Sequence, residues 1–165
     1  MPELIVFTDS SVNPQTQVGY GAYLALAEFG LSPSELLSSI KLRRFEQTSS
    51  TRLELQTLLW ALGELPILGT QLRVYTDSQN IIGLPGRRAR LEQNGYRSRN
   101  KKRLANYLLY QEFYRFSDSL DCQWLKVCGH QLSEQKNDIA RLFTLVDRAA
   151  RQALRAETCS KFIKL

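Results

Sequence analysis

Residues 4–11 read Leu-Ile-Val-Phe-Thr-Asp-Ser-Ser, a run of apolar, β-branched and aromatic residues that ends on the carboxylate of Asp9. Such a run predicts a strand that is buried on both faces. The pattern Val-Phe-Thr-Asp-Ser at residues 6–10 returns as Val-Tyr-Thr-Asp-Ser at residues 74–78. If the two strands are neighbours, Asp9 and Asp77 lie about one strand spacing apart, roughly 5 Å.

Two carboxylates at that separation repel each other unless protons or a divalent cation lie between them. Each aspartate alone has an ordinary explanation, because an aspartate after a strand is most often a turn former or a helix N-cap. The repetition of the whole pattern weighs against that explanation and favours a metal site.

The composition suits one globular domain over residues 1–165, since 43% of the residues are hydrophobic and the length allows a proper core. The first residues lack the pattern of a signal peptide, and no window approaches the roughly 18 apolar residues of a membrane span. Three cysteines without a Cys-x-x-Cys motif predict a reduced, cytoplasmic protein. Their spacing from the single histidine, His130, does not suit zinc.

The basic residues are concentrated in one segment. Residues 86–115 contain nine basic and two acidic side chains, a net charge of +7, whereas the whole chain carries +6, which leaves −1 for the remainder. A basic protrusion at about residues 86–106 favours a polyanionic partner such as nucleic acid, although a solvated charged loop is the alternative.

Periodicity along the chain predicts an α/β fold. We expect five strands, over residues 4–11, 18–26, 40–45, 72–76 and 121–127. We expect helices from the hydroxyl cluster at residues 48–51 up to Pro66, and over residues 80–84, 104–120 and 137–157. The first three strands form an antiparallel meander, and the fourth, which follows a helical crossover, lies parallel to the first.

Two local features complete this prediction. Residues 30–39 are polar and contain Pro33, which predicts a loop. Gly19 and Gly21, inside the second strand, indicate either a bulge or a close approach of another backbone.

Motifs along nearly the whole chain resemble type 1 ribonuclease H, of the bacterial kind with a basic protrusion. The segments that carry the resemblance are Thr8–Ser11, Gly19–Ala22, Thr51–Leu55, Tyr75–Gln79, Leu91–Tyr96 followed by Lys101–Lys102, Trp124–His130 and Val146–Arg151. Tyr-Thr-Asp-Ser-Gln at residues 75–79 matches the family motif residue for residue. The resemblance implies a ribonuclease H-like fold, in which three meander strands and two parallel strands form a mixed sheet flanked by helices.

The implied activity is endonucleolytic hydrolysis of the RNA strand of RNA–DNA hybrids by a two-metal-ion mechanism, leaving 5′-phosphate and 3′-hydroxyl ends. The resemblance implies that two Mg²⁺ ions, with Mn²⁺ as an alternative, are held by Asp9, Glu54, Asp77 and Asp147. Oxygen ligands suit Mg²⁺, and two such ions stabilise the attacking and leaving oxygens of a phosphodiester. His130 would assist proton transfer or product release.

The fourth ligand has two candidates. Asp138 stands in a sequence that also resembles the final family motif. Asp147 is preferred, because the residues that follow it continue into a better helix.

The resemblance also implies contacts with the hybrid. Minor-groove contacts fall on Ser50, Thr51 and Gln79, and contacts with a phosphate of the DNA strand fall on Ser49 and Asn13. Backbone contacts on the basic protrusion fall on Arg97, Lys101 and Lys102. The 2′-hydroxyl distinguishes RNA from DNA, and basic side chains follow phosphates without reading sequence. We expect no membrane partner and a monomer.

This sequence departs from the family at several positions. Ser10 replaces a glycine and could crowd the scissile phosphate, and the minor-groove positions 50 and 51 carry hydroxyls in place of amides. One alternative function is therefore a catalytically weak or inactive module that binds hybrids or double-stranded RNA. A second is a proofreading exonuclease, which resembles Asp-x-Glu on the first strand, but residue 11 here is serine.

Overall fold

The computed structural model describes residues 3–27, 29–66, 69–127 and 134–163, without the side chains of residues 134–137 and 161–163. Its centre is one five-stranded sheet in the order β3-β2-β1-β4-β5. The strands are β1 (Glu3–Asn13), β2 (Val18–Leu26), β3 (Lys41–Phe45), β4 (Gln71–Thr76) and β5 (Asp121–Lys126). The β1–β2 and β2–β3 pairs are antiparallel, and the β1–β4 and β4–β5 pairs are parallel. The mixed sheet predicted from the sequence is confirmed.

The two strands that share a sequence pattern are neighbours in register. Val6 pairs with Val74 and Phe7 with Tyr75 in the parallel β1–β4 ladder. The side chains of Val6, Phe7 and Val74 are fully buried, as expected for strands covered on both faces. This register carries Asp9 and Asp77 to corresponding positions at the same edge of the sheet.

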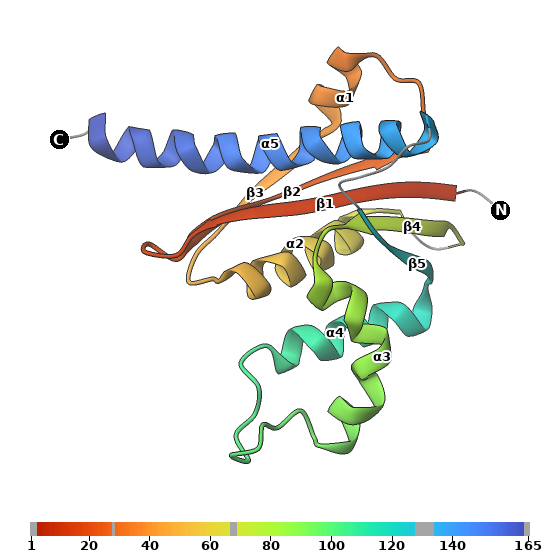
Figure 1. Ribbon diagram of the computed structural model, residues 1–165, viewed down its shortest axis with the longest axis vertical. Helices are drawn as coiled ribbons and strands as arrows, with labels where there is room; N and C mark the ends of the chain where they lie inside the picture. The colour runs from red at the N-terminus through yellow and green to blue at the C-terminus, as the bar shows by residue number, and fades with distance from the viewer. Residues whose placement is uncertain (1–2, 28, 67–68, 128–133, 164–165) are drawn as a thin grey trace.

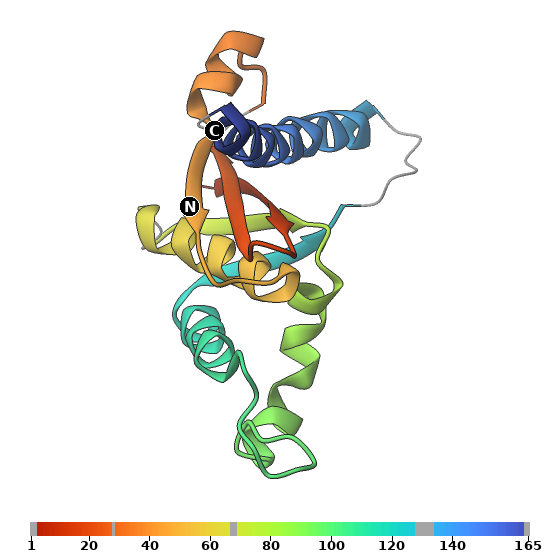
Figure 2. The same ribbon diagram turned by 90° about the vertical axis from the view of Figure 1, so that its left-hand side faces the viewer.

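Helices cover both faces of the sheet. They are α1 (Pro33–Ser39), α2 (Ser50–Glu64), α3 (Gln79–Gln93), α4 (Tyr107–Ser119) and α5 (Glu134–Ile163). Figures 1 and 2 show α5 along one face, with α2, α3 and α4 on the other. One hydrophobic core lies between the sheet and α2, α3 and α4, and a second lies under α5. None of the described helices is long and apolar enough to cross a membrane.

The predicted loop over residues 30–39 is wrong, because most of it forms the short helix α1. Ser32 is the N-cap and its hydroxyl accepts a hydrogen bond from the Glu35 backbone N–H at 3.3 Å. The Glu35 carboxylate accepts in return from the Ser32 backbone N–H at 3.2 Å, which completes a capping box. Pro33 occupies the first turn, where a proline needs no hydrogen-bond donor.

The helix predicted over residues 80–84 ends too early, because α3 continues through Pro85 to Gln93. An interior proline removes one helical hydrogen bond and normally ends or kinks a helix. Here the Tyr114 hydroxyl, from α4, donates a hydrogen bond to the Leu84 carbonyl at 2.6 Å. Packing against α4 therefore supports the helix at this point, and the first part of the predicted protrusion is helical.

Gly19 and Gly21 mark a close approach of α2 and not a bulge. The β1–β2 register is continuous through both positions. A Cβ atom at Gly21 would lie 2.2 Å from Thr57 Oγ1, and one at Gly19 would lie 2.4 Å from Leu53 Cδ2. The absence of a side chain at these two positions of β2 thus lets α2 pack closely on the sheet, which brings Glu54 toward β1.

We expect Gly21→Ala to lower the free energy of unfolding by about 1–3 kcal/mol, because the new methyl group overlaps Thr57 in a packed core. The same change should lower activity by displacing α2. Thr57→Ala added to Gly21→Ala should recover part of the stability. Gly63→Ala is the control, since Gly63 lies in α2 with nothing within 4 Å of its Cβ position, and it should stabilise by up to about 1 kcal/mol. Urea unfolding of the wild type and the three variants measures these differences, and equal losses in Gly21→Ala and Gly63→Ala would contradict the packing argument.

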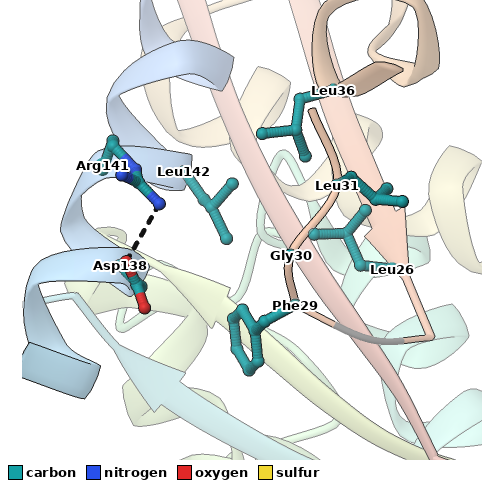
Figure 3. Close-up of a pocket in the computed structure, with 8 residues that line it drawn as sticks. All are labelled: Leu26, Phe29, Gly30, Leu31, Leu36, Asp138, Arg141 and Leu142. Carbon is teal, nitrogen blue, oxygen red and sulfur yellow. Dashed lines mark hydrogen bonds and ion pairs between the residues drawn. The ribbon is translucent and has the colours of Figure 1, made fainter. Parts of the chain in front are cut away.

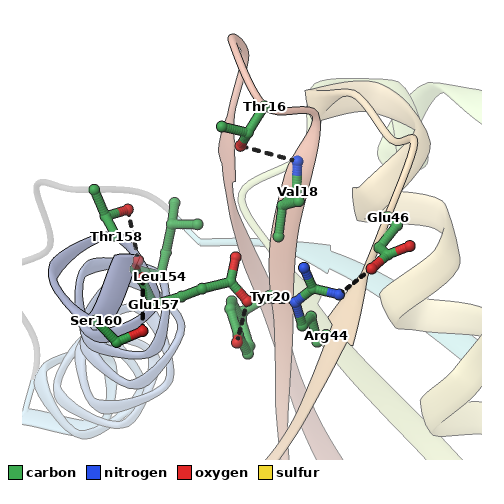
Figure 4. Close-up of polar contacts among 9 residues, drawn as sticks. All are labelled: Thr16, Val18, Tyr20, Arg44, Glu46, Leu154, Glu157, Thr158 and Ser160. Carbon is green, nitrogen blue, oxygen red and sulfur yellow. Dashed lines mark hydrogen bonds and ion pairs between the residues drawn. The ribbon is translucent and has the colours of Figure 1, made fainter. Parts of the chain in front are cut away.

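The far end of α5 is tied to the sheet by a polar network (Figure 4). The Tyr20 hydroxyl donates to the Glu157 carboxylate at 2.9 Å, and Arg44 on β3 forms ion pairs with both Glu157 and Glu46. Glu157 is the residue of this group on α5, and its contacts hold the far end of the helix beside β2 and β3. Apolar packing under α5, which includes Val146 and Ala150 on either side of Asp147, holds the helix against the sheet.

Candidate active site

Four elements bring four carboxylates together at one end of the central strands. Asp9 lies within β1, Asp77 directly follows β4, Glu54 lies near the start of α2, and Asp147 lies in α5. Asp9 is hydrogen-bonded to Asp147 and feels the charge of Asp77, which in turn acts on Glu54. The residues that the sequence resemblance implied are therefore gathered in one cluster.

The Asp9 carboxyl has the most perturbed environment of the cluster. Burial raises its pKa to about 8, with further increases from the hydrogen bond to Asp147 and from the charges of Asp77 and Asp147. A hydrogen bond from the Ser10 backbone N–H lowers the pKa but does not offset these effects. A buried carboxyl among like charges is the arrangement that a proton or a cation relieves.

Ser78 holds Glu54 in the cluster, and the sequence did not identify it as a site residue. The Ser78 hydroxyl donates to Glu54 Oε2 at 2.6 Å and accepts from the Ile81 backbone N–H at 3.2 Å, as the N-cap of α3. Burial raises the pKa of Glu54 and the Ser78 hydrogen bond lowers it, while the charge of Asp77 raises it. The adjacency of Ser78 to Asp77 in the repeated motif is the signal that could have identified it.

Ser78→Ala should raise the metal concentration needed for half-maximal cleavage about 10- to 100-fold, since Glu54 loses the group that orients it. It should also cost about 1 kcal/mol of stability through the lost cap. Ser32→Ala removes a cap from α1, far from the cluster, and should reproduce the stability loss without changing the metal requirement. Ser78→Thr keeps the hydroxyl and should restore most of the metal dependence. An unchanged metal titration for Ser78→Ala would rule out this positioning role.

Two basic side chains flank Asp77, and the sequence prediction missed both. Burial and the charge of Asp147 raise the Asp77 pKa, whereas the charges of Lys126 and Arg151 lower it. Arg151 Nε is 3.1 Å from Asp147 Oδ1, and Lys126 Nζ donates to Gln79 Oε1 at 2.5 Å. Cations from β5 and α5 therefore stand beside the carboxylates.

Asp138, the alternative fourth ligand, lies elsewhere. It is nine residues from Asp147 in α5, which corresponds to about 14 Å along the helix and half a turn around it. Asp138 forms an ion pair with Arg141 at 3.0 Å. Figure 3 shows the pair at a pocket of about 270 Å³. The pocket is otherwise lined by Leu26, Phe29, Gly30, Leu31, Leu36 and Leu142.

The residues expected to contact the substrate lie around the cluster. Ser49 is the N-cap of α2, where its hydroxyl accepts from the Arg52 backbone N–H at 3.4 Å, and Ser50 and Thr51 are exposed on the first turn. Asn13 Oδ1 accepts from the Gln15 backbone N–H at 3.0 Å, so this side chain shapes the β1–β2 turn. His130 lies outside the described residues.

The basic protrusion is built on a buried tyrosine. Tyr96 is 8% exposed and packs with the core between α3 and α4. Beyond it, Arg97 pairs with Arg103 across an isolated bridge, and the Arg97 guanidinium donates to the Lys101 carbonyl at 2.9 Å. Lys101 and Lys102 are exposed. Figures 1 and 2 show this segment projecting away from the sheet beyond the ends of α3 and α4.

The chemistry of the donor set fits a hard divalent cation. All four side chains offer carboxylate oxygens, the ligands of Mg²⁺ and Mn²⁺. Among the described residues, no group of three or more His, Cys, Asp or Glu side chains is already arranged around a single ion position.

Comparisons with known proteins agree on one family. A family model described as RNase H matches residues 1–155. The ribonuclease H of Acetivibrio thermocellus is 28% identical over 148 residues, which are 87% of this chain and 94% of that protein. The ribonuclease H of Roseobacter denitrificans is 30% identical over 146 residues, 86% of this chain and 95% of that protein.

Two solved structures share the fold. The crystal structure of LC9-RNase H1, a type 1 RNase H with the type 2 active-site motif, matches with a TM-score of 0.62 at 20% identity, over 92% of this chain and 73% of that one. The foamy viral protease-reverse transcriptase in complex with dsDNA matches with a TM-score of 0.57 at 12% identity, over 90% of this chain and 92% of that one. Because the RNase H family model spans almost the whole sequence and the mixed sheet agrees with it, this chain belongs to the RNase H family of enzymes.

Proposed function

We propose that this protein cuts the RNA strand of RNA–DNA hybrids internally, with two divalent cations held by Asp9, Glu54, Asp77 and Asp147. The observation that carries the proposal is the buried Asp9 carboxyl, whose pKa is raised to about 8 by burial and by its two aspartate neighbours. Repulsion within such a cluster destabilises the folded protein, and bound cations would relieve that repulsion. Family membership supports cleavage of the RNA strand of hybrids in general.

The bound cations would supply a water of lowered pKa and would neutralise charge on the attacking and leaving oxygens. Asp9, which interacts with both Asp147 and Asp77, would be a ligand shared by the two ions. Glu54, whose carboxylate accepts a hydrogen bond from Ser78, would contribute from α2. Hydrolysis would leave a 5′-phosphate and a 3′-hydroxyl, and His130 would move a proton or assist product release.

Recognition of the hybrid would use the surface around the cluster. Ser50, Thr51 and Gln79 would contact the minor groove, where the 2′-hydroxyl identifies RNA. Ser49 and Asn13 would hold a phosphate of the DNA strand, and Arg97, Lys101 and Lys102 would contact backbone phosphates.

We expect Ser10 to permit cleavage, because its backbone N–H donates a hydrogen bond to the Asp9 carboxyl as the backbone N–H of a glycine could. The binding module that has lost its catalytic function is the alternative that the cleavage test decides.

The test is incubation of the protein with an end-labelled RNA–DNA hybrid in Mg²⁺, with double-stranded DNA and double-stranded RNA as control substrates. Internal cuts confined to the RNA strand of the hybrid, and lost in Asp77→Asn, support the proposal. Product ends are identified by their reactivity with phosphatase and ligase. Tight binding of the hybrid without cutting in either Mg²⁺ or Mn²⁺ would instead support the binding module.

A further inference from the structure

Two cationic side chains, Lys126 and Arg151, approach the carboxylate cluster from opposite faces of the sheet. Thr76 and Lys126 are paired residues of β4 and β5, so Lys126 lies beside the residue that precedes Asp77. Its ammonium group is held against Gln79, the first residue of α3. Arg151 extends from α5, one turn after Asp147. Figure 2 shows α3 and α5 on opposite sides of the sheet.

Both side chains are available to an incoming ligand. Lys126 is exposed, and its partner Gln79 is a neutral amide that leaves the ammonium charge in place. The Arg151 side chain is 61% exposed, and an ion pair this open to water is weak. A phosphodiester oxygen offers either group a charge-assisted hydrogen bond, and a guanidinium can bind a phosphate with two.

The electrostatics of the cluster create a need for such groups. A nucleic acid strand that reaches four carboxylates brings further negative charge toward them. Of the described residues whose charges act on Asp77, Lys126 and Arg151 are the two cationic ones. The basic protrusion projects away from the sheet, beyond the ends of α3 and α4 (Figure 1).

We propose that Lys126 and Arg151 form a phosphate clamp, which binds backbone phosphates of the RNA strand on the two sides of the bond that is cut. This inference rests on the proposed function, because it assumes that the hybrid lies across the carboxylate cluster. In the free protein the two side chains are held by Gln79 and Asp147, and they exchange these partners for phosphates when the strand binds.

The clamp is tested by the salt dependence of hybrid binding. Lys126→Gln and Arg151→Gln are each made in an Asp9→Asn background, which binds without cutting, and a fluorescent hybrid is titrated at several NaCl concentrations. Each change should weaken binding about tenfold. Each should also reduce the slope of log K against log[NaCl] by about one.

Arg141→Gln is the matched control. Arg141 lies in the same helix and pairs with Asp138 at 3.0 Å, as Arg151 pairs with Asp147 at 3.1 Å, but it is ten residues from Arg151. It should leave affinity and slope unchanged. Arg151→Lys should keep the slope while losing part of the affinity, because an ammonium group binds phosphate as a point charge.

A second measurement locates the contact. One neutral methylphosphonate linkage replaces the phosphate on the 5′ side or the 3′ side of a defined cleavage position in the RNA strand. Each neutral linkage should weaken binding of the hybrid by the parent Asp9→Asn protein. One of the two linkages should cause no further loss of affinity in Lys126→Gln, and the other should cause no further loss in Arg151→Gln. The clamp would be overturned if each linkage and each substitution weakened binding additively in every combination. It would also be overturned if the salt-dependence slopes of Lys126→Gln and Arg151→Gln equalled that of Arg141→Gln.

The two proposals fail in different ways. Wild-type protein that cuts the hybrid while the variants keep the parent slope would overturn the clamp alone. Wild-type protein that neither binds nor cuts the hybrid would overturn the proposed function, and the clamp with it.

Discussion

Asp147→Asn is expected to reduce RNA cleavage about a thousandfold, whereas Asp138→Asn should leave it within about twofold. The first change removes one carboxylate charge from the cluster that would hold the cations. Those cations would stabilise the transition state by several kcal/mol. The second removes a carboxylate that pairs with Arg141, about 14 Å farther along α5 and on the other side of the helix.

Initial rates on a labelled hybrid in saturating Mg²⁺ measure this pair of effects. The two substitutions are chemically identical and lie in one helix, so each is the control for the other. Circular dichroism should show that both variants keep the wild-type helix content. Retained cleavage in Asp147→Asn together with loss in Asp138→Asn would move the fourth ligand to Asp138 and contradict the site described above.

Asp9→Asn is expected to abolish cleavage and yet stabilise the fold at pH 8 without divalent cations, by on the order of 3 kcal/mol. In the unfolded chain the Asp9 carboxyl ionises near pH 4, whereas in the folded protein burial and Asp147 raise its pKa to about 8. Between those values the folded state binds more protons than the unfolded state. The free energy of unfolding therefore falls as pH rises from about 4 to about 8 and then levels off.

Urea unfolding of wild type and Asp9→Asn in EDTA, from pH 5 to pH 9, measures this dependence. The two curves should converge at low pH and separate as pH rises, because asparagine does not titrate. Adding Mg²⁺ at pH 8 should stabilise the wild type more than the variant, since a ligand that binds only the folded state raises its stability. Parallel curves across the whole range would mean that Asp9 is not held at a raised pKa.

These opposite effects on activity and stability have one cause. In the proposed function the carboxylates would bind cations because they are crowded and partly buried, and that same arrangement should destabilise the protein until a proton or cation neutralises it. Gly19 and Gly21 contribute by letting α2 pack on β2 so closely that Glu54 reaches the cluster.

The sequence by itself determined the sheet and the approximate positions of the carboxylates. The repeated Val-x-Thr-Asp-Ser pattern specifies two buried strands that each lead to an aspartate, and hydrophobic periodicity locates α2, α4 and α5. The sequence prediction failed at α1, because residues 30–39 with Pro33 predicted a loop, and at the second half of α3, because the predicted helix ended at Leu84. A capping box begins α1 at Ser32. A hydrogen bond from Tyr114, 30 residues away, contacts α3 at Leu84, beside Pro85.

Only the tertiary structure decided which residues meet. Asp138 and Asp147 stand in similar sequences, and the choice between them depends on which side of α5 faces β1, which packing along the whole helix sets. Ser78 follows the aspartate of the repeated motif, but Lys126 and Arg151 have no distinguishing local pattern. The contacts of Ser78 with Glu54 and of Lys126 with Gln79, and the effect of the Arg151 charge on Asp77, join different elements. Local sequence records propensity and periodicity, whereas contacts between distant side chains exist only once the chain has folded.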